Sequence, residues 1–411
     1  QIFFAYFCLL KISRMKKSIF LLLMFVCELA TASTGDTIKI KSPKFVSFQL
    51  AEGMIFPTSR ITGKTQTPNV VSLNVKYGLL AKGDKWEDFY YGMPYRGIGI
   101  YKPFYSVHKE TGQPFSVYLF QGGGLKTFRS GISLNYEINL GMSFNWKHFD
   151  IDERSHFEAL GSSINAHLGG MLYLKKPISK RLDLHLGIDV LHFSNGALRT
   201  PNYGINSMSA VVGVAYRLHE ERPEMKTESP ATMPAAFKKR TVHDLSVFVT
   251  SRTVNIDTAE TKLQSRYPER RFKVVGLNYA YMWHHARRFM WGPSVELLYD
   301  EGNKVKIDGE FSEETNICRE VVKLGKVSDR FSVGLSLKGE LAMPGYAVFA
   351  NLGYNLLHHN HEEKRLYQIY GVKVYLTEGL SSSFGVRSNH LTHSQFLYLS
   401  VGYTFRTYRG G

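Results

Sequence analysis

The sequence predicts an all-β protein, an antiparallel transmembrane β-barrel protein of about sixteen strands. Apolar and polar residues alternate with a period of two along most of its 411 residues, as in strands whose two faces meet different surroundings. The chain holds 24 Tyr, 27 Phe and 36 Gly but only 14 Pro, a composition typical of many short strands. A secretion signal near the N-terminus is the third observation.

The secretion signal lies in residues 1–32. Two lysines precede the run Ser18–Val26, which is apolar after Ser18, and an Ala-x-Ala pattern ends at Ala32. This is the pattern of a cleaved signal peptide, and a run of nine residues is too short to span a bilayer as a helix. We therefore expect residues 1–32 to be an upstream extension and signal peptide, and the exported protein to reside in the bacterial outer membrane.

The alternating segments fall into two groups of eight. In the first group they cover residues 45–50, 71–77, 97–107, 115–120, 131–146, 164–174, 182–194 and 206–216. In the second group they cover residues 245–249, 272–283, 289–299, 331–341, 346–356, 367–376, 382–390 and 396–405. Many reach about ten residues, which is the length that a tilted strand needs to cross a bilayer.

The segment at residues 182–194 illustrates the two faces that we expect of each strand. Apolar side chains occupy the even positions Leu184, Leu186, Ile188 and Val190, whereas the odd positions hold His185, Gly187 and Asp189. An apolar outer face with a polar inner face is the pattern of outer-membrane barrels. A soluble β-sandwich also alternates, but the export signal and the single cysteine outside residues 1–32 favour the barrel.

A charged, proline-bearing break divides the two groups of strands. We expect residues 33–218 to form one barrel unit, residues 219–242 a linker, and residues 243–411 a second, degenerate unit. Both halves end in a similar way, with a Gly-Val or Gly-Ile pair, a histidine five residues after the glycine, and a final glycine-led strand. Two eight-stranded barrels in tandem are therefore favoured over one large barrel.

The candidate catalytic residues lie at the end of the strand 182–194. His192 and Ser194 continue its lipid-facing positions, and side chains two residues apart on a strand lie about 7 Å from each other. Asn206 lies on the same face of the following strand, where we expect it opposite Ser194 and diagonal to His192. A histidine next to a serine is the minimum for an activated nucleophile, and a polar belt at a strand end is the alternative interpretation.

The segment His-x-Ser-Asn-Gly followed by Pro-Asn-x-Gly-Ile, residues 192–205, resembles the PagL-type lipid A deacylases, also called acyloxyacyl hydrolases. The resemblance implies an outer-membrane barrel with Ser194 as nucleophile and His192 as general base. It implies oxyanion or loop support from Asn195, Gly196 and Asn202. Asn206 stands where the family has a glutamate, and so it would orient the imidazole without supplying a negative charge.

The function that follows is a serine esterase that removes a fatty acyl chain from lipid A. We expect lipid A or lipopolysaccharide and outer-membrane lipids as partners, because a net charge of +16 suits their phosphates, and no nucleic acid, because the chain is exported. We expect no cofactor and no metal, and interpret the histidines at 358, 359 and 361 as part of a solvated loop. A non-catalytic structural or pore-forming barrel is the alternative.

Overall fold

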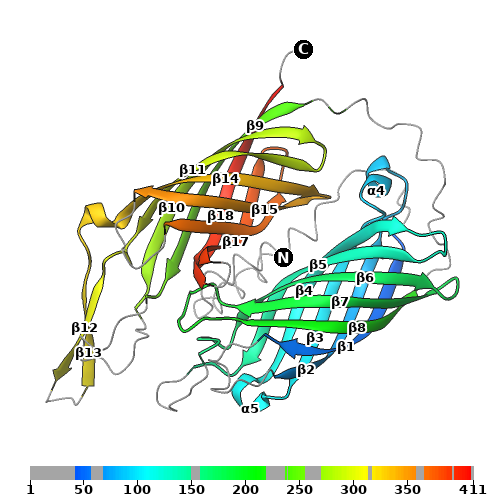
Figure 1. Ribbon diagram of the computed structural model, residues 1–411, viewed down its shortest axis with the longest axis horizontal. Helices are drawn as coiled ribbons and strands as arrows, with labels where there is room; N and C mark the ends of the chain where they lie inside the picture. Colours follow the sequence, from blue (N-terminus) through cyan, green and yellow to red (C-terminus); the bar gives the residue numbers. More distant parts are fainter. Residues whose placement is uncertain are drawn as a thin grey trace, which may run out of the picture.

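The computed structural model describes residues 42–56, 68–149, 158–218, 237, 239–254, 270–312, 317–357, 365–390 and 393–408. It contains two closed antiparallel barrels of eight strands each (Figure 1). The first is formed by consecutive hairpins: β1 (Lys44–Ile55), β2 (Asn69–Leu80), β3 (Tyr95–Tyr105), β4 (Gly112–Thr127), β5 (Ser133–Trp146), β6 (Asn165–Pro177), β7 (Leu182–Ser194) and β8 (Ile205–Arg217). It closes where β8 pairs with β1, so that no edge strand remains unpaired.

The second barrel repeats this topology and closes between its first and last strands, β9 and β18. Its strands are β9 (Arg240–Arg252), β10 (Phe272–Ala286), β11 (Phe289–Asp300), β14 (Phe331–Met343), β15 (Tyr346–Leu357), β16 (Leu366–Tyr375), β17 (Leu380–His390) and β18 (His393–Tyr408). Short helices α4 (Trp86–Tyr90), α5 (His108–Thr111) and η3 (Val327–Arg330) lie between strands of the two barrels. Within the described residues, no helix is long and apolar enough to cross a membrane.

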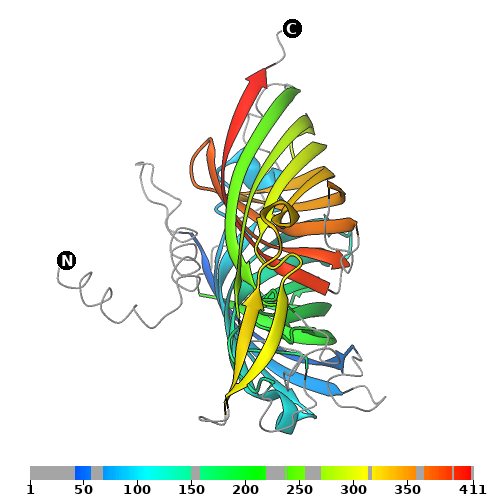
Figure 2. The ribbon, with the colours of Figure 1, turned by 90° about the vertical axis from the view of Figure 1, so that its left-hand side faces the viewer.

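The sixteen strands expected from the sequence are the sixteen strands of the two barrels, which confirms the tandem arrangement over one large barrel. The sequence missed the hairpin of β12 (Lys306–Ser312) and β13 (Ile317–Lys323), which projects beyond the wall of the second barrel (Figure 2). Each of its strands has only seven residues, shorter than any strand of the barrel walls, and three of the seven are charged. The strand β9 begins at Arg240, inside the segment that we expected to be a linker. Residues 1–32 lie outside the described part.

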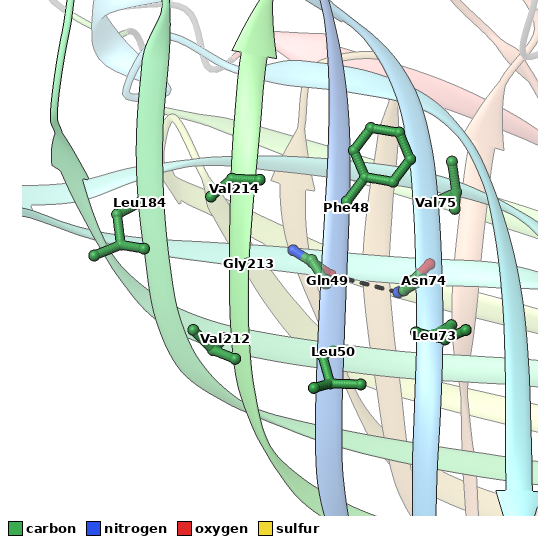
Figure 3. Close-up of a pocket in the computed structure, with 10 residues that line it drawn as sticks. All are labelled: Phe48, Gln49, Leu50, Leu73, Asn74, Val75, Leu184, Val212, Gly213 and Val214. Carbon is green, nitrogen blue, oxygen red and sulfur yellow. Dashed lines mark hydrogen bonds between the residues drawn. The ribbon is translucent and has the colours of Figure 1, made fainter.

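The walls of the barrels have the two faces that the alternation predicts. On the first barrel, outward side chains form an apolar surface with a shallow depression of about 360 Å³ across β7, β8, β1 and β2. Figure 3 shows Leu50, Leu73 and Val212 among its lining. The next residues along β1 and β2, Gln49 and Asn74, are joined by a hydrogen bond of 3.4 Å (Figure 3) and are buried or half-buried.

Aromatic and charged side chains fill the inside of the first barrel. Lys76 and Glu137 form an ion pair of 2.5 Å, and both side chains are buried. The hydroxyl of Tyr95 donates to Glu137 at 3.2 Å and accepts from the hydroxyl of Tyr173 at 2.8 Å. A buried charge pair is tolerated when further hydrogen bonds satisfy it, and here they do. An interior of eight strands is just wide enough for such side chains to fill.

The inside of the second barrel is also filled, mainly by ion pairs. Asp244 accepts hydrogen bonds from Lys338 at 2.6 Å and from Lys373 at 2.7 Å. Arg387 donates to Glu296 at 3.0 Å and to Asn355 at 3.0 Å, and its guanidinium contacts the rings of Tyr367 and Phe396. Both barrels are therefore packed bodies.

The two barrels lie side by side, with corresponding ends together (Figure 1). At one end, Arg288 of the turn between β10 and β11 stacks on Tyr90 and Tyr91 of the first barrel. At the other end, Thr253, which follows β9, contacts the segment between β7 and β8. Between these ends, outward apolar residues of β5 and β6 pack against those of β16, β17 and β18. The wall of the first barrel is thus covered on one side by the second.

Candidate active site

The three predicted site residues lie together at the end of the hairpin formed by β7 and β8. His192 and Ser194 are the last outward-facing residues of β7, and Asn206 is the second residue of β8. The expected register was wrong by two residues, because Asn206 pairs directly with His192 and not with Ser194. The pairing of β7 with β8 ends at Phe193 and Ile205, and this register brings Asn206 into direct reach of the imidazole.

The three side chains form a continuous chain of hydrogen bonds. The distance from His192 Nδ1 to Asn206 Oδ1 is 2.7 Å, and the distance from His192 Nε2 to Ser194 Oγ is 2.8 Å. An amide oxygen can only accept, so Nδ1 carries the proton and donates it to Asn206. Nε2 is then the unprotonated nitrogen and accepts the hydrogen bond from the Ser194 hydroxyl. The arrangement is that of a serine poised against a general base whose tautomer is fixed by a third residue.

The backbone between His192 and Ser194 is anchored from the inside of the barrel. Phe193 is fully buried, stacks on Tyr101, and contacts the rings of Trp146 and His167. Because neighbouring residues on a strand point to opposite faces, this inward anchor holds His192 and Ser194 on the outer face. The position of the serine therefore depends on the packed interior.

Gly204 makes room for the imidazole ring. A Cβ atom at this position would lie 2.8 Å from His192 Cε1, and the backbone has φ = +76°, which L side chains rarely adopt. Its backbone N–H donates to the carbonyl oxygen of Ala159 at 2.9 Å. The sequence motif contained Gly204, but only the structure indicates that the histidine lies against it.

Asn195 and Asn202 hold the segment that follows the serine. The backbone N–H of Asn195 donates to Asn202 Oδ1 at 2.9 Å, and Asn195 Nδ2 donates to the carbonyl oxygen of Arg199 at 2.9 Å. Asn195 Nδ2 also donates to Ser162 Oγ at 3.0 Å, which ties the segment to the loop before β6. Of the two roles expected for these asparagines, these contacts are those of loop support.

The backbone N–H of Gly196 has a different environment. It donates to none of the residues that the structure describes, and Gly196 has φ = +60°. This main-chain donor, two residues after the serine, is therefore without a hydrogen-bond partner among the described residues.

No metal site accompanies these residues in the described ranges, where no three His, Cys, Asp or Glu side chains gather closely enough to hold an ion. The histidines at 358, 359 and 361 lie outside the described residues. In the second half of the chain, His390 is the histidine that follows a glycine by five residues, and only its backbone is described.

Sequence reasoning missed four residues that contact the site segment. Ser162 precedes β6, and Thr253, Ser394 and Leu397 belong to the second barrel. A serine or threonine in or next to a strand carries no local signal for a contact with a residue 33 or more positions away. Only the packing of the two barrels brings these residues to the site.

Comparison with solved structures gives only weak similarities. An outer membrane channel from Pseudomonas putida F1 aligns with a TM-score of 0.22 at 7% identity, covering 92% of this chain and 100% of that one. A mutant porin of Rhodopseudomonas blastica aligns with a TM-score of 0.16 at 10% identity, covering 89% and 99%. We draw nothing further from these two similarities. A comparison with curated protein sequences finds no match.

Comparison with models of protein families identifies both barrels. Residues 71–215 match the family described as lipid A 3-O-deacylase (PagL), and residues 243–407 match the acyloxyacyl hydrolase C-terminal domain. The first match includes the site hairpin, and together the two matches cover most of the chain. The first barrel therefore belongs to the lipid A 3-O-deacylase (PagL) family, and the second barrel is an acyloxyacyl hydrolase C-terminal domain.

Proposed function

We propose that the protein is a serine esterase of the bacterial outer membrane that removes an acyl chain from lipid A. The observation that carries this proposal is the hydrogen-bonded chain Ser194–His192–Asn206 on the outer face of a barrel of the lipid A deacylase family. The family description names the 3-O position, so the ester-linked acyl chain at that position is the expected target.

In the proposed reaction, Ser194 Oγ attacks the carbonyl carbon of the ester while His192 Nε2 takes the hydroxyl proton. The imidazolium that forms is held by its Nδ1–H bond to Asn206 Oδ1. When the tetrahedral intermediate collapses, His192 returns the proton to the leaving alkoxide of the sugar, and the acyl group remains on Ser194. Water, activated by the same histidine, then releases the fatty acid and restores the serine.

We assign the developing oxyanion to the backbone N–H of Gly196. That donor has no partner among the described residues, whereas the N–H of Asn195 is already bound to Asn202. Preorganised backbone donors are a common way to stabilise such a charge. Asn195 and Asn202 then act indirectly, by holding the segment that presents Gly196.

The outer wall supports a membrane-embedded substrate. Leu186, Ile188 and Val190 precede the site on the same face of β7, and each is about half exposed on the barrel exterior. In an outer membrane, these side chains would lie against acyl chains, and the polar site at the strand end would lie near the headgroups. An acyl ester of lipid A therefore has its carbonyl and its chain on the surface where the serine lies.

A pore is not favoured as the alternative, because ion pairs and aromatic rings fill both barrels. A non-catalytic structural barrel is the remaining alternative, and the experiment separates it from the esterase. Mass spectrometry would compare lipid A from cells that express the parent, the Ser194→Ala variant or neither. We expect the parent alone to produce lipid A that lacks one ester-linked chain. Unchanged lipid A in the presence of well-folded parent protein would contradict the proposal.

A further inference from the structure

The segment between β7 and β8, residues 195–204, is held by three residues of the second barrel: Ser394, Thr253 and Leu397. Asn202 Nδ2 donates to Ser394 Oγ of β18 at 3.2 Å. The backbone N–H of Thr200 donates to Thr253 Oγ1 at 3.0 Å, and the backbone N–H of Thr253 donates to the carbonyl oxygen of Ala197 at 3.3 Å. Thr253 is itself buried. The segment that follows the serine is therefore held at Ala197, Thr200 and Asn202 by residues of the second barrel.

The third of these residues, Leu397, makes an apolar contact at Gly196. A Cβ atom here would overlap the side chain of Leu397, which is buried in the contact between the barrels. The Leu397 side chain therefore lies directly against the backbone that carries the N–H group two residues after Ser194. Movement of Leu397 would change the space into which this backbone fits.

The second barrel also covers one flank of Ser194. On β6, Ala166 pairs with Ser194 and Leu168 pairs with His192, so these two are the outward neighbours of the site. Both belong to the apolar cluster that β16, β17 and β18 form against the first barrel. Ser194 is only 4% exposed, whereas His192 on the same strand and Asn206 on β8 are half-buried. The open approach to the serine is therefore from the β8 side.

From these contacts we infer that the second barrel is a working part of the esterase site, with Ser394 as a positioning residue. The inference rests on the proposed function. Ser394 fixes the amide of Asn202, whose oxygen holds the backbone N–H of Asn195 next to the nucleophile. The second barrel thereby sets the position of Ser194 and of the Gly196 N–H, and directs the lipid substrate to the β8 side.

The test uses the full-length protein in detergent, with the Ser394→Ala and Ser394→Thr variants and lipid A as substrate. Ser394→Ala removes the hydroxyl that accepts the bond from Asn202, and Ser394→Thr keeps it. One neutral hydrogen bond corresponds to about a threefold to tenfold effect. We expect kcat to fall by that factor in Ser394→Ala with KM unchanged, and to stay within about twofold of the parent in Ser394→Thr. The heat-modifiable gel shift of the barrels measures the folded fraction used to normalise each rate.

A second pair of variants tests the inference without Ser394, should its alanine variant fold poorly. Leu397→Ala removes the side chain that lies against Gly196, whereas Leu399→Ala removes an equal side chain from the same cluster two residues away. We expect only Leu397→Ala to lower kcat.

Three results would overturn the inference. Folded Ser394→Ala with the kcat of the parent would mean that the contact does not position the site. Equal losses in the alanine and threonine variants, with a raised KM, would mean that the second barrel contributes only to substrate binding. A folded parent without activity would contradict the proposed function as well as this inference. The other two results differ from it because in both of them the parent is active.

Discussion

Asn206 provides the sharpest prediction, because its substitution by aspartate changes the charge of the site without changing its shape. Asn206 Oδ1 lies 2.7 Å from His192 Nδ1, and an aspartate oxygen can occupy the same place. The Nδ2 group of Asn206 donates to none of the described residues, so its replacement breaks no hydrogen bond among them. The variant therefore adds one negative charge next to the imidazole that becomes cationic during the reaction.

The size of the effect follows from the distance between the two charges. Unit charges about 4 Å apart attract each other by about 4 kcal/mol at an effective dielectric constant of about 20. Both side chains are half-buried, so solvent and headgroups reduce this to about 2 kcal/mol. A transition state stabilised by about 2 kcal/mol is reached about thirtyfold faster. We expect Asn206→Asp to raise kcat by about that factor, and Asn206→Glu to raise it less, because its longer side chain must adopt another rotamer.

The assay is the release of fatty acid from lipid A by purified protein in detergent, normalised by the gel-shift measure of folding. Asn206→Ala is the matched control, because it removes the acceptor, and we expect it to lose activity but less than Ser194→Ala or His192→Ala. If the site were only a polar belt at a strand end, a carboxylate there would lower the folding yield and leave lipid A intact. Well-folded Asn206→Asp with the kcat of the parent would refute the role given to Asn206.

Two further substitutions test the packing on which the site depends. Gly204→Ala places a Cβ atom 2.8 Å from His192 Cε1, so we expect at least about a tenfold loss of kcat in the fatty-acid release assay. The control is Gly131→Ala, which has a similar φ but open space around it, and we expect this variant to keep full activity. Lys76→Met leaves Glu137 charged and buried, so we expect the free energy of unfolding in a urea titration to fall by about 3–5 kcal/mol. The double variant with Glu137→Leu should recover most of this loss. A single variant as stable as the parent would contradict this prediction.

The fold could be predicted well from the sequence because apolar and polar residues alternate along a barrel strand, one kind on each face. The strand β7 begins and ends at the expected residues, Leu182 and Ser194, since its alternation continues without a break. The hairpin of β12 and β13 was missed because its strands are short, seven residues each with three of them charged, and so they lack the long alternation of a strand that crosses the barrel wall. The number of barrels was inferred from the charged break between the two groups of strands and from the similar endings of the two halves.

The site was predicted in part. His192, Ser194 and Asn206 could be placed on one face, because side-chain direction follows from counting residues along a strand. Their register could not, since the pairing of β7 with β8 depends on the conformation of the turn between them. The contacts of Thr253, Ser394 and Leu397 were beyond reach for another reason: they arise from the packing of two separate barrels, which leaves no periodic signal in either.

The central claim is that Ser194 is the nucleophile of an esterase, and a fluorophosphonate tests it most directly, because such a reagent forms a stable bond only with an activated serine. The folded parent protein would be incubated with the reagent, digested and mapped by mass spectrometry, with Ser194→Ala and His192→Ala as controls. We expect one adduct per folded chain, on the peptide that contains Ser194, and none in either control. A folded parent that remains unlabelled, or an adduct on another serine that persists in Ser194→Ala, would contradict the claim.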